Sequence, residues 1–347
     1  MAVTLKQIAN IVGVDVSVVS RVLNDKTENY HFTEERIKQI RTTAREQGYI
    51  PNTYAQAVKT GKFGCVALLL SSHGDRSYLP NLLLDSIHKE LEKNAKHLLL
   101  TKLPDANGED FSKIPTILKT LMADGLIVDY THHVSSGMES RIENFILPKV
   151  WINTKRKFDC VYPNNLNAGM KAANKLIKSG HKNIAYVTDV SYQISKYGEH
   201  YSMPDRYNGY AAQMENAGLK IRKYDGEGKV IPKNKLIDYF VNILSKPDRP
   251  TAMILYWSSL VPALLNAARK LKINIPDDLS IITFAGCISK HAGLSINAMI
   301  EPEKQMGIES VKMLIRKITD PDKLLKSIPL AFSYYDTGSC AKLLIAD

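Results

Sequence analysis

Residues 4–24 read TLKQIANIVGVDVSVVSRVLN, and this stretch decides the fold of the N-terminal part of the chain. Apolar residues spaced at i, i+3, i+4 and i+7 predict a first helix: Leu5, Ile8, Ala9 and Val12. Thr4 can cap this helix and Gly13 can end it, because glycine tolerates a positive φ. A second helix is expected to begin at Asp15 or Val16, after one tight turn. Two short helices joined in this way are typical of a helix-turn-helix, although a generic helical bundle has the same periodicity.

The following segment, residues 33–52, reads TEERIKQIRTTAREQGYIPN and predicts a third helix. Thr33 stands at its start, and the two glutamates after it favour the positive end of the helix dipole. Three apolar residues form its inner stripe: Ile37, Ile40 and Ala44. Gly48 is expected to stop it. In a helix-turn-helix of this size, the second helix enters the major groove of DNA, where its first turn meets base edges.

The amino-acid sequence of both segments closely resembles that of the head of the lactose-repressor (LacI/GalR) family. In that family the phrase runs T-L-x-D-I-A-x-x-A-G-V-S-x-x-T-V-S-R-V-L-N, followed by a helix that ends L-G-Y-x-P-N. This chain matches it with almost no gaps, apart from a longer loop at residues 26–31. The resemblance implies base contacts at three residues: Val16, Ser17 and Arg21. It implies phosphate contacts at four more: Thr4, Ser20, Asn24 and Thr33.

Among the implied base contacts, Arg21 is the best candidate for specificity, because its guanidinium can pair with guanine O6 and N7 together. Val16 can offer only an apolar contact to a thymine methyl group. Two departures from the family phrase bear on this surface. Asp15 replaces the usual serine but can still cap the second helix. Val18 replaces the usual threonine, so one hydroxyl contact to DNA is expected to be lost.

Residues 51–62 are interpreted as a hinge. Seven residues, 53–59, suffice for about two helical turns, and a helix this short is unstable by itself in water. A plain linker is the alternative. The resemblance to the family pattern P-N-x-x-A-x-x-L implies minor-groove contacts at four residues: Asn52, Ala55, Val58 and Lys59. Val58 stands where the family has a leucine that wedges into the DNA, so a shallower wedge is expected.

From Gly64 onward, short apolar runs alternate with helical stripes. The expected strands are Cys65–Leu70, Leu98–Lys102, Leu126–Asp129, Val150–Asn153, Asn183–Thr188, Met253–Tyr256 and Leu279–Phe284. The expected helices are Leu79–Asn94, Ile114–Met122, Leu166–Ser179, Asp205–Ala217, Lys233–Leu244 and Leu260–Lys272. Alternating β and α units predict parallel sheets flanked by helices, and the length predicts two such lobes. Ligands in such folds bind at the carboxyl ends of the strands, here between the lobes.

The family resemblance continues more weakly through the core, for example in DGLIV at 124–128, SGHKNIAYV at 179–187 and RYNGY at 206–210. It implies an all-α helix-turn-helix head joined to an α/β core like a periplasmic binding protein, with two doubly wound lobes. The expected domains are a head (1–50), a hinge (51–62) and a core (63–347). Within the core, the N-lobe is expected at about 63–160 and 290–320, and the C-lobe at about 161–289 and 321–347.

The expected effector pocket departs from the family pattern. The family often has acidic residues after the strand ending in phenylalanine, but here Ala285 and Gly286 follow Phe284. Six residues are the candidates for effector contacts: Tyr78, Asp129, Asn153, Arg206, Trp257 and Ala285. Trp257 is interpreted either as a core residue or as a stacking platform. With Arg206 as its fixed cation, the pocket is expected to favour a ligand with an anionic or strongly accepting group at one end and a flat or apolar face at the other. Asp129 opposes this, because it could replace the missing acids.

Composition constrains the class of protein. The net charge of +11 makes a polyanionic partner plausible without locating it. The four cysteines are far apart, and no metal-binding or phosphate-loop motif is present, so we expect reduced thiols, no metal and no cofactor. The longest apolar runs are too short to cross a bilayer, and the N-terminus lacks an export signal. We therefore expect a cytoplasmic protein without a membrane partner.

The sequence leaves three classes of function to distinguish. The first is a transcriptional regulator, expected to be a repressor, whose affinity for a near-palindromic DNA operator is controlled by a small, carbohydrate-related effector. It is expected to act as a homodimer, with a tetramer as the alternative. The second is a solute-binding protein, which needs an export signal and no helix-turn-helix. The third is an enzyme with an accessory head, but the chain shows no catalytic motif, and we expect no catalytic residues.

Overall fold

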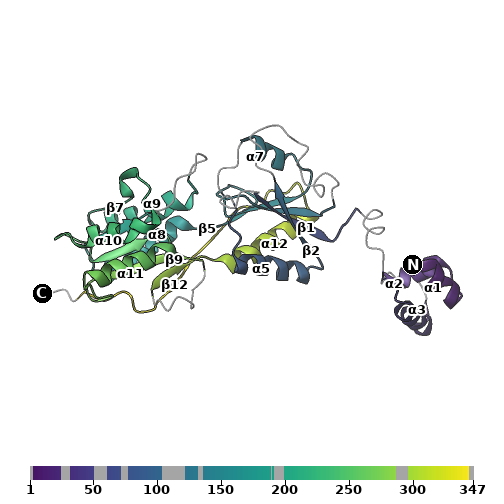
Figure 1. Ribbon diagram of the computed structural model, residues 1–347. Coiled ribbons are helices and arrows are strands. Elements are labelled where there is room, and N and C mark those ends of the chain that lie inside the picture. Colours follow the sequence, from purple (N-terminus) through teal and green to yellow (C-terminus); the bar gives the residue numbers. More distant parts are fainter. Residues whose placement is uncertain are drawn as a thin grey trace. The chain divides into compact units, whose positions relative to one another are not determined.

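The computed structural model describes residues 3–24, 32–50, 61–71, 77–103, 122–131, 136–188, 190, 199–286 and 296–343 (Figure 1). Contacts divide the chain into two compact units, residues 1–63 and 64–347. The first unit contains the three-helix head, and the second contains two α/β lobes. The loop at 26–31, the hinge at 51–60 and nearly all of the helix expected at 114–122 lie outside the described residues.

The head consists of α1 (Leu5–Val12), α2 (Val16–Leu23) and α3 (Glu34–Glu46). Thr4 caps α1 in a reciprocal capping box with Gln7, and Gly13 ends it at φ 72°. The Asp15 carboxylate accepts the backbone N–H of Ser17 at 2.8 Å, which confirms the expected cap of α2. The buried core is formed by seven small or branched residues: Ile8, Ala9, Val12, Val19, Val22, Ile40 and Ala44. The predicted three-helix head is thus confirmed.

The first lobe is built on a six-stranded parallel sheet with the order β11-β5-β4-β3-β1-β2. Its strands are β1 (Cys65–Ser71), β2 (His97–Leu103), β3 (Gly125–Asp129), β4 (Lys149–Ile152), β5 (Cys160–Pro163) and β11 (Ile328–Leu330). Helices α5 (Asn81–Lys93) and α12 (Glu303–Thr319) cover one face, and α7 (Ser136–Glu143) lies over the other (Figure 1). Coverage of both faces explains why β1 is an unbroken apolar run instead of an alternating one.

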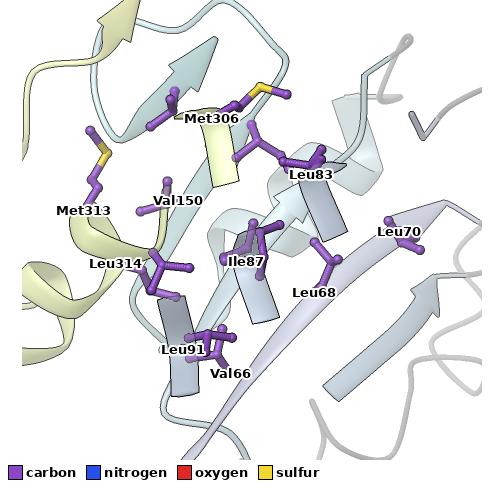
Figure 2. Packing of buried hydrophobic residues seen from close by; sticks show 14 of the residues in the cluster. Val66, Leu68, Leu70, Leu83, Ile87, Leu91, Val150, Met306, Met313 and Leu314 are labelled. Atoms are coloured by element: carbon purple, nitrogen blue, oxygen red, sulfur yellow. The ribbon is translucent and has the colours of Figure 1, made fainter. Parts of the chain in front are cut away.

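Figure 2 shows the packing between this sheet and its two covering helices. Leu68 of β1 and Ile127 of β3 belong to the same buried cluster as Ile87 of α5 and Leu314 of α12. Each of these four side chains is fully buried. Burying an aliphatic side chain of this size contributes roughly 1.5–3 kcal/mol relative to its exposed state. This cluster therefore fixes α12, which comes from late in the chain, against the early strands.

The second lobe repeats the design with the strand order β12-β10-β9-β8-β6-β7. Its strands are β6 (Ile184–Val187), β7 (Arg222–Tyr224), β8 (Ala252–Leu255), β9 (Ser280–Ala285), β10 (Asn297–Ile300) and β12 (Ser333–Tyr335), the last antiparallel to β10. Its helices are α8 (Asn165–Lys178) and α9 (Ser202–Asn216) on one face, and α10 (Leu236–Leu244) and α11 (Val261–Lys270) on the other. The chain crosses from β5 to α8, from β10 to α12, and from β11 to β12.

The lobe boundaries expected near the C-terminus need correction. We expected residues 290–320 in the first lobe and 321–347 in the second. Instead, β10 joins the second sheet through parallel pairing with β9, and β11 joins the first through pairing with β5. Strands of three or four residues carry too little periodicity to show their sheet, so long-range pairing decides their place.

Both sheets are wound in two directions from their first strand. In the first sheet β1 lies between β2 and β3, and in the second β6 lies between β7 and β8. Loops at the carboxyl ends of the strands diverge at such a switch point and leave a crevice for a ligand. Ser71, Asp129 and Ile152 end strands of the first sheet, while Leu255 and Ile300 end strands of the second.

Candidate functional site

Two glycines bring α8 and α9 into backbone contact. A Cβ atom at Gly169 would overlap the carbonyl oxygen of Arg206, and one at Gly209 would overlap that of Leu166. Only glycine permits so close an approach of two helices. The crossing holds Arg206 on the buried side of α9, where its side chain is only 1% exposed.

The Arg206 guanidinium is the centre of a buried network. Its Nε donates to Asn165 Oδ1 at 2.8 Å, and its Nη1 donates to the carbonyl of Tyr256 at 3.0 Å. Its Nη2 forms an ion pair with Glu301, whose side chain is 10% exposed. The expectation that Arg206 supplies a fixed, uncompensated cation is therefore wrong. Sequence reasoning missed Glu301, although an acidic residue directly after the apolar run 297–300 is a signal that could have found it.

A cavity of about 270 Å³ opens beside this network. It is lined by Tyr78, Thr131, Asn153, His200, Ser202, Met203, Arg206, Tyr256, Trp257 and Glu301. The lining includes four of the six residues expected to contact an effector: Tyr78, Asn153, Arg206 and Trp257. These lining residues follow the carboxyl ends of strands or begin α9, as the switch-point geometry requires.

Asn153 anchors one wall of the cavity. Its backbone is left-handed, with φ 52°, a conformation that asparagine tolerates better than most residues. Its carbonyl oxygen accepts a hydrogen bond from His200 Nε2 at 3.0 Å, and His200 Nδ1 lies 2.8 Å from the Ser202 hydroxyl. That hydroxyl lies 2.8 Å from the Tyr256 hydroxyl. The chain of contacts links the segment after β4 to the start of α9 and the end of β8.

Tyr78 forms the opposite wall. Its ring meets Trp257 edge to face, with the ring centroids 6.1 Å apart. Its hydroxyl donates a hydrogen bond to Glu303 Oε1 at 3.1 Å. Trp257 lines the cavity, and so its placement agrees with the stacking platform better than with a core residue. Tyr78 therefore joins the first lobe to the second lobe at Trp257 and to the crossover segment at Glu303.

Glu303 is a second carboxylate that sequence reasoning missed. It is the first residue of α12 and is 2% exposed. Burial, followed by repulsion from Glu301, raises the pKa of Glu303 to about 7, although the hydrogen bond from Tyr78 opposes the shift. Burial also raises the pKa of Glu301, and the charge of Arg206 opposes that shift. A second cavity, of about 360 Å³, contains Glu301, Glu303 and Gly286 in its lining.

Two expected effector residues do not line the first cavity. Ala285 ends β9 and is 7% exposed. Asp129 ends β3 and is fully buried, and neither of its carboxylate oxygens has a hydrogen-bond partner among the residues that the structure describes. Burial holds the pKa of Asp129 well above its usual range, against a smaller opposing effect of the Tyr78 backbone. The neutral acid is therefore the form that its surroundings favour.

In the head, the implied DNA contacts lie around α2. Val16 is 38% exposed and Ser17 is exposed in the first turn, while Val19 and Val22 of the same helix point into the core. Arg21 is half-buried in the last turn, and its charge lowers the pKa of Asp15, after the larger effect of the hydrogen bonds from Ser17.

The remaining implied phosphate contacts lie at helix ends. Thr4 and Thr33 are exposed N-caps of α1 and α3. Ser20 and Asn24 are half-buried, and the Asn24 amide donates to the Ser20 carbonyl at 2.6 Å. The implied minor-groove residues of the hinge lie outside the described residues.

Within the described segments, no helix is long and apolar enough to cross a membrane. In the same segments, no group of three or more histidine, cysteine, aspartate or glutamate side chains could hold a metal ion.

Comparisons with known proteins agree with this geometry. Residues 173–332 match the family described as "Periplasmic binding protein-like domain". The HTH-type transcriptional regulator RegA of Clostridium saccharobutylicum is 26% identical over 91% of this chain and 92% of its own length. The ribose operon repressor of Escherichia coli (strain K12) is 24% identical over 97% of this chain and 99% of its own.

These near full-length matches extend from the head to the end of the core. The chain is thus similar over nearly its whole length to transcriptional regulators of the kind that the sequence resemblance indicates. Among solved structures, a lac repressor dimer bound to operator and the anti-inducer ONPF superposes with a TM-score of 0.74, 16% identity, and coverage of 98% of this chain and 100% of that one. A transcriptional regulator CelR–cellobiose complex gives a TM-score of 0.61 at 17% identity, covering 97% of this chain and 99% of that one. These two structures support the fold of a helix-turn-helix head joined to a two-lobed α/β core.

Proposed function

We propose that the protein is a transcriptional repressor whose affinity for a DNA operator changes when a small ligand occupies the cleft lined by Tyr78, Arg206 and Trp257. The observation that carries the proposal is the combination of two sites in one chain. An exposed first turn of α2 supplies a surface for base edges, and a cavity at the carboxyl ends of the core strands supplies a ligand site.

On the DNA side, Val16, Ser17 and Arg21 contact bases. Thr4, Ser20, Asn24 and Thr33 contact phosphates. Asn52, Ala55, Val58 and Lys59 contact the minor groove. One head of this size offers few contacts, so two chains bind a near-palindromic operator as a dimer. Because its target is the chromosome, the protein acts in the cytoplasm, and the mechanism requires no catalytic step.

On the ligand side, the effector is a small, carbohydrate-related molecule. The ribose operon repressors and the CelR–cellobiose complex among the similar proteins have names that refer to sugars. The cavity itself offers neutral hydrogen-bonding groups at Asn153 and Ser202, and the ring of Trp257, which is a suitable surface for the apolar face of a sugar.

The hydrogen-bond chain from Asn153 through His200 and Ser202 to Tyr256 couples elements of both lobes around this space. A ligand that binds one arrangement of the lobes better than another shifts the population of the arrangements. The same ligand then changes the affinity of the two heads for their operator by the same coupling free energy.

The test begins with selection of operator sequences from random DNA by the full-length protein. Operator affinity is then measured by fluorescence anisotropy with and without each member of a sugar and glycoside panel. We expect a near-palindromic operator, a steep loss of affinity with salt, and at least one ligand that changes affinity. The control is a duplex with only one half-site, which should bind far more weakly. Equal affinity for operator and scrambled DNA would overturn the proposal.

A further inference from the structure

The charges of the cleft narrow the chemical class of the effector. Arg206 and Glu301 form an ion pair, so together they contribute no net charge to the space. Glu303 is then a second carboxylate beside the pair, and repulsion from Glu301 is one of the causes of its raised pKa. Among the described residues, no lysine or arginine forms an ion pair with Glu303, and the hydroxyl of Tyr78 is a neutral partner. The cleft therefore has one negative charge without a counter-ion whenever Glu303 is ionised.

The aromatic rings around this charge give a second, independent observation. Tyr78, whose hydroxyl meets Glu303, also lines the first cavity, and its ring edge faces Trp257. Tyr256 lines the same cavity. Aromatic faces attract cations, and Tyr256 and Trp257 already lie near the Arg206 guanidinium, at 4.9 and 5.4 Å from their ring centroids. The Glu303 carboxylate lines the second cavity and contacts Tyr78, whose ring lines the first, and a carboxylate beside aromatic rings favours a positive group.

The size and the neutral lining constrain the rest of the ligand. The cavity of about 270 Å³ lies just below the range of ~300–1,000 Å³ for ligand pockets, so it suits a small ligand. Asn153, Thr131 and Ser202 provide neutral donors and acceptors suited to hydroxyl groups. Glu301 lines both this cavity and the second one, which Glu303 also lines, so the Glu303 carboxylate belongs to the cavity adjoining the first at Glu301.

We propose that the effector carries a protonated amino group, held by the Glu303 carboxylate beside the rings of Tyr78 and Trp257, on a small hydroxylated body of hexose size. The inference rests on the proposed function, because it names the ligand class for the same cleft. An acidic ligand meets Glu301 and Glu303 and is disfavoured. A neutral sugar satisfies the hydroxyl-binding groups but leaves the charge of Glu303 without a counter-ion.

The test uses three hexoses that differ only at C6, namely 6-amino-6-deoxyglucose, glucose and glucuronate, together with the 2-amino and 3-amino isomers. Binding to the full-length protein is measured by calorimetry near neutral pH. We expect at least one aminohexose to bind about tenfold or more tightly than glucose, and glucuronate to bind most weakly. In Glu303→Gln, the ratio of aminohexose affinity to glucose affinity is expected to fall about tenfold. Glu309→Gln, the same substitution two turns along α12, is the control that keeps the preference.

The outcomes separate the two proposals. Equal affinity for amino and neutral hexoses, tightest binding of glucuronate, or no binding of any aminohexose would overturn the amine inference. A preference that survives Glu303→Gln would also overturn it. If a neutral hexose nevertheless changes operator affinity, the ligand-controlled repressor stands. If aminohexoses bind in the cleft but leave operator affinity unchanged, the amine site stands and the proposed function fails.

Discussion

The carboxylate of Glu303 occupies the space into which a side chain at position 286 would project. A Cβ atom on Gly286 would overlap Glu303 Oε1 and lie 2.7 Å from the Tyr78 hydroxyl. The family pattern often places acids at the two positions after Phe284, and this chain has Ala285 and Gly286 there instead. The acid at this end of the cleft comes from α12 instead of from β9. The sequence predicts a pocket that lacks the family's carboxylates, but the structure shows that carboxylates are present.

Gly286→Ala tests whether the Glu303 carboxylate occupies the place of a side chain at position 286. The added methyl group displaces the ends of the Glu303 and Tyr78 side chains, so we expect loss of the preference for amino over neutral hexoses. The free energy of unfolding is expected to fall by about 1–3 kcal/mol, the usual range for overpacking. Gly137→Ala in α7, where a Cβ atom meets nothing within 4 Å, is the matched control and should cost no stability. An unchanged ligand preference in Gly286→Ala would show that the Glu303 carboxylate does not contribute.

Arg206→Met tests the buried ion pair. Removal of the guanidinium leaves the Glu301 carboxylate in a buried site without its cation, so we expect a loss of about 3–5 kcal/mol in the free energy of unfolding. The double variant Arg206→Met with Glu301→Gln should regain much of this loss, because no charge is then left unpaired. Urea unfolding of the four proteins in this cycle measures the coupling. Additive effects of the two substitutions would contradict the pairing.

How far the sequence predicts this molecule depends on the range of the interactions involved. The head is predictable almost to the residue, because its caps at Thr4 and Asp15 and its turn at Gly13 are local features. The long apolar strands, such as β1, are equally predictable from the sequence. By contrast, β10 and β11 are short, and their sheets are decided by pairing with β9 and β5, which no local pattern reveals.

The residues of the site divide in the same way, into those that local sequence predicts and those that depend on long-range contacts. Tyr78, Asn153 and Trp257 follow recognisable strands, and their place at one cavity follows from the rule for carboxyl ends. Arg206 lines the cavity, but its pairing is not predictable from the sequence because its partner Glu301 lies 95 residues away along the chain. Pairing at that separation is visible only after the chain has folded.

The raised pKa of Glu303 predicts a dependence of stability on pH. The groups that face this carboxyl are Tyr78 and Glu301, with Arg206 behind Glu301. An acid whose pKa is higher in the folded than in the unfolded protein adds stability when protonated. Here that contribution is complete below the ordinary value of 4.5 and is lost as the pH rises through about 7.

The melting temperature of the ligand-free protein is therefore expected to fall as the pH rises from about 4.5 to about 7, and to fall less in Glu303→Gln. Thermal unfolding of the two proteins in matched buffers gives the difference that Glu303 contributes, since other groups titrate in both. Parallel curves for wild type and Glu303→Gln would show that the carboxyl does not titrate in this range.

Arg21→Ala tests whether Arg21 contacts a base or only the phosphate backbone. Arg21 lies in the last turn of α2, while the exposed Val16 and Ser17 lie in the first, so the three residues span the helix that enters the groove. A guanidinium paired with one guanine discriminates against other bases by about 1–3 kcal/mol. We expect the variant to lose affinity for operator by this amount and to become tolerant at one position in each half-site. Its affinity for random DNA should change little.

The comparison is Lys59→Ala, which removes a hinge cation proposed to lie near the backbone. This variant should weaken binding to operator and random DNA by similar factors and should reduce the salt dependence, because fewer counterions are released. Anisotropy titrations against operator, single-base variants and random duplex, each at several salt concentrations, separate the two patterns. If Arg21→Ala instead lowers affinity equally for all duplexes, Arg21 contacts phosphate, and base recognition rests on the first turn of α2 alone.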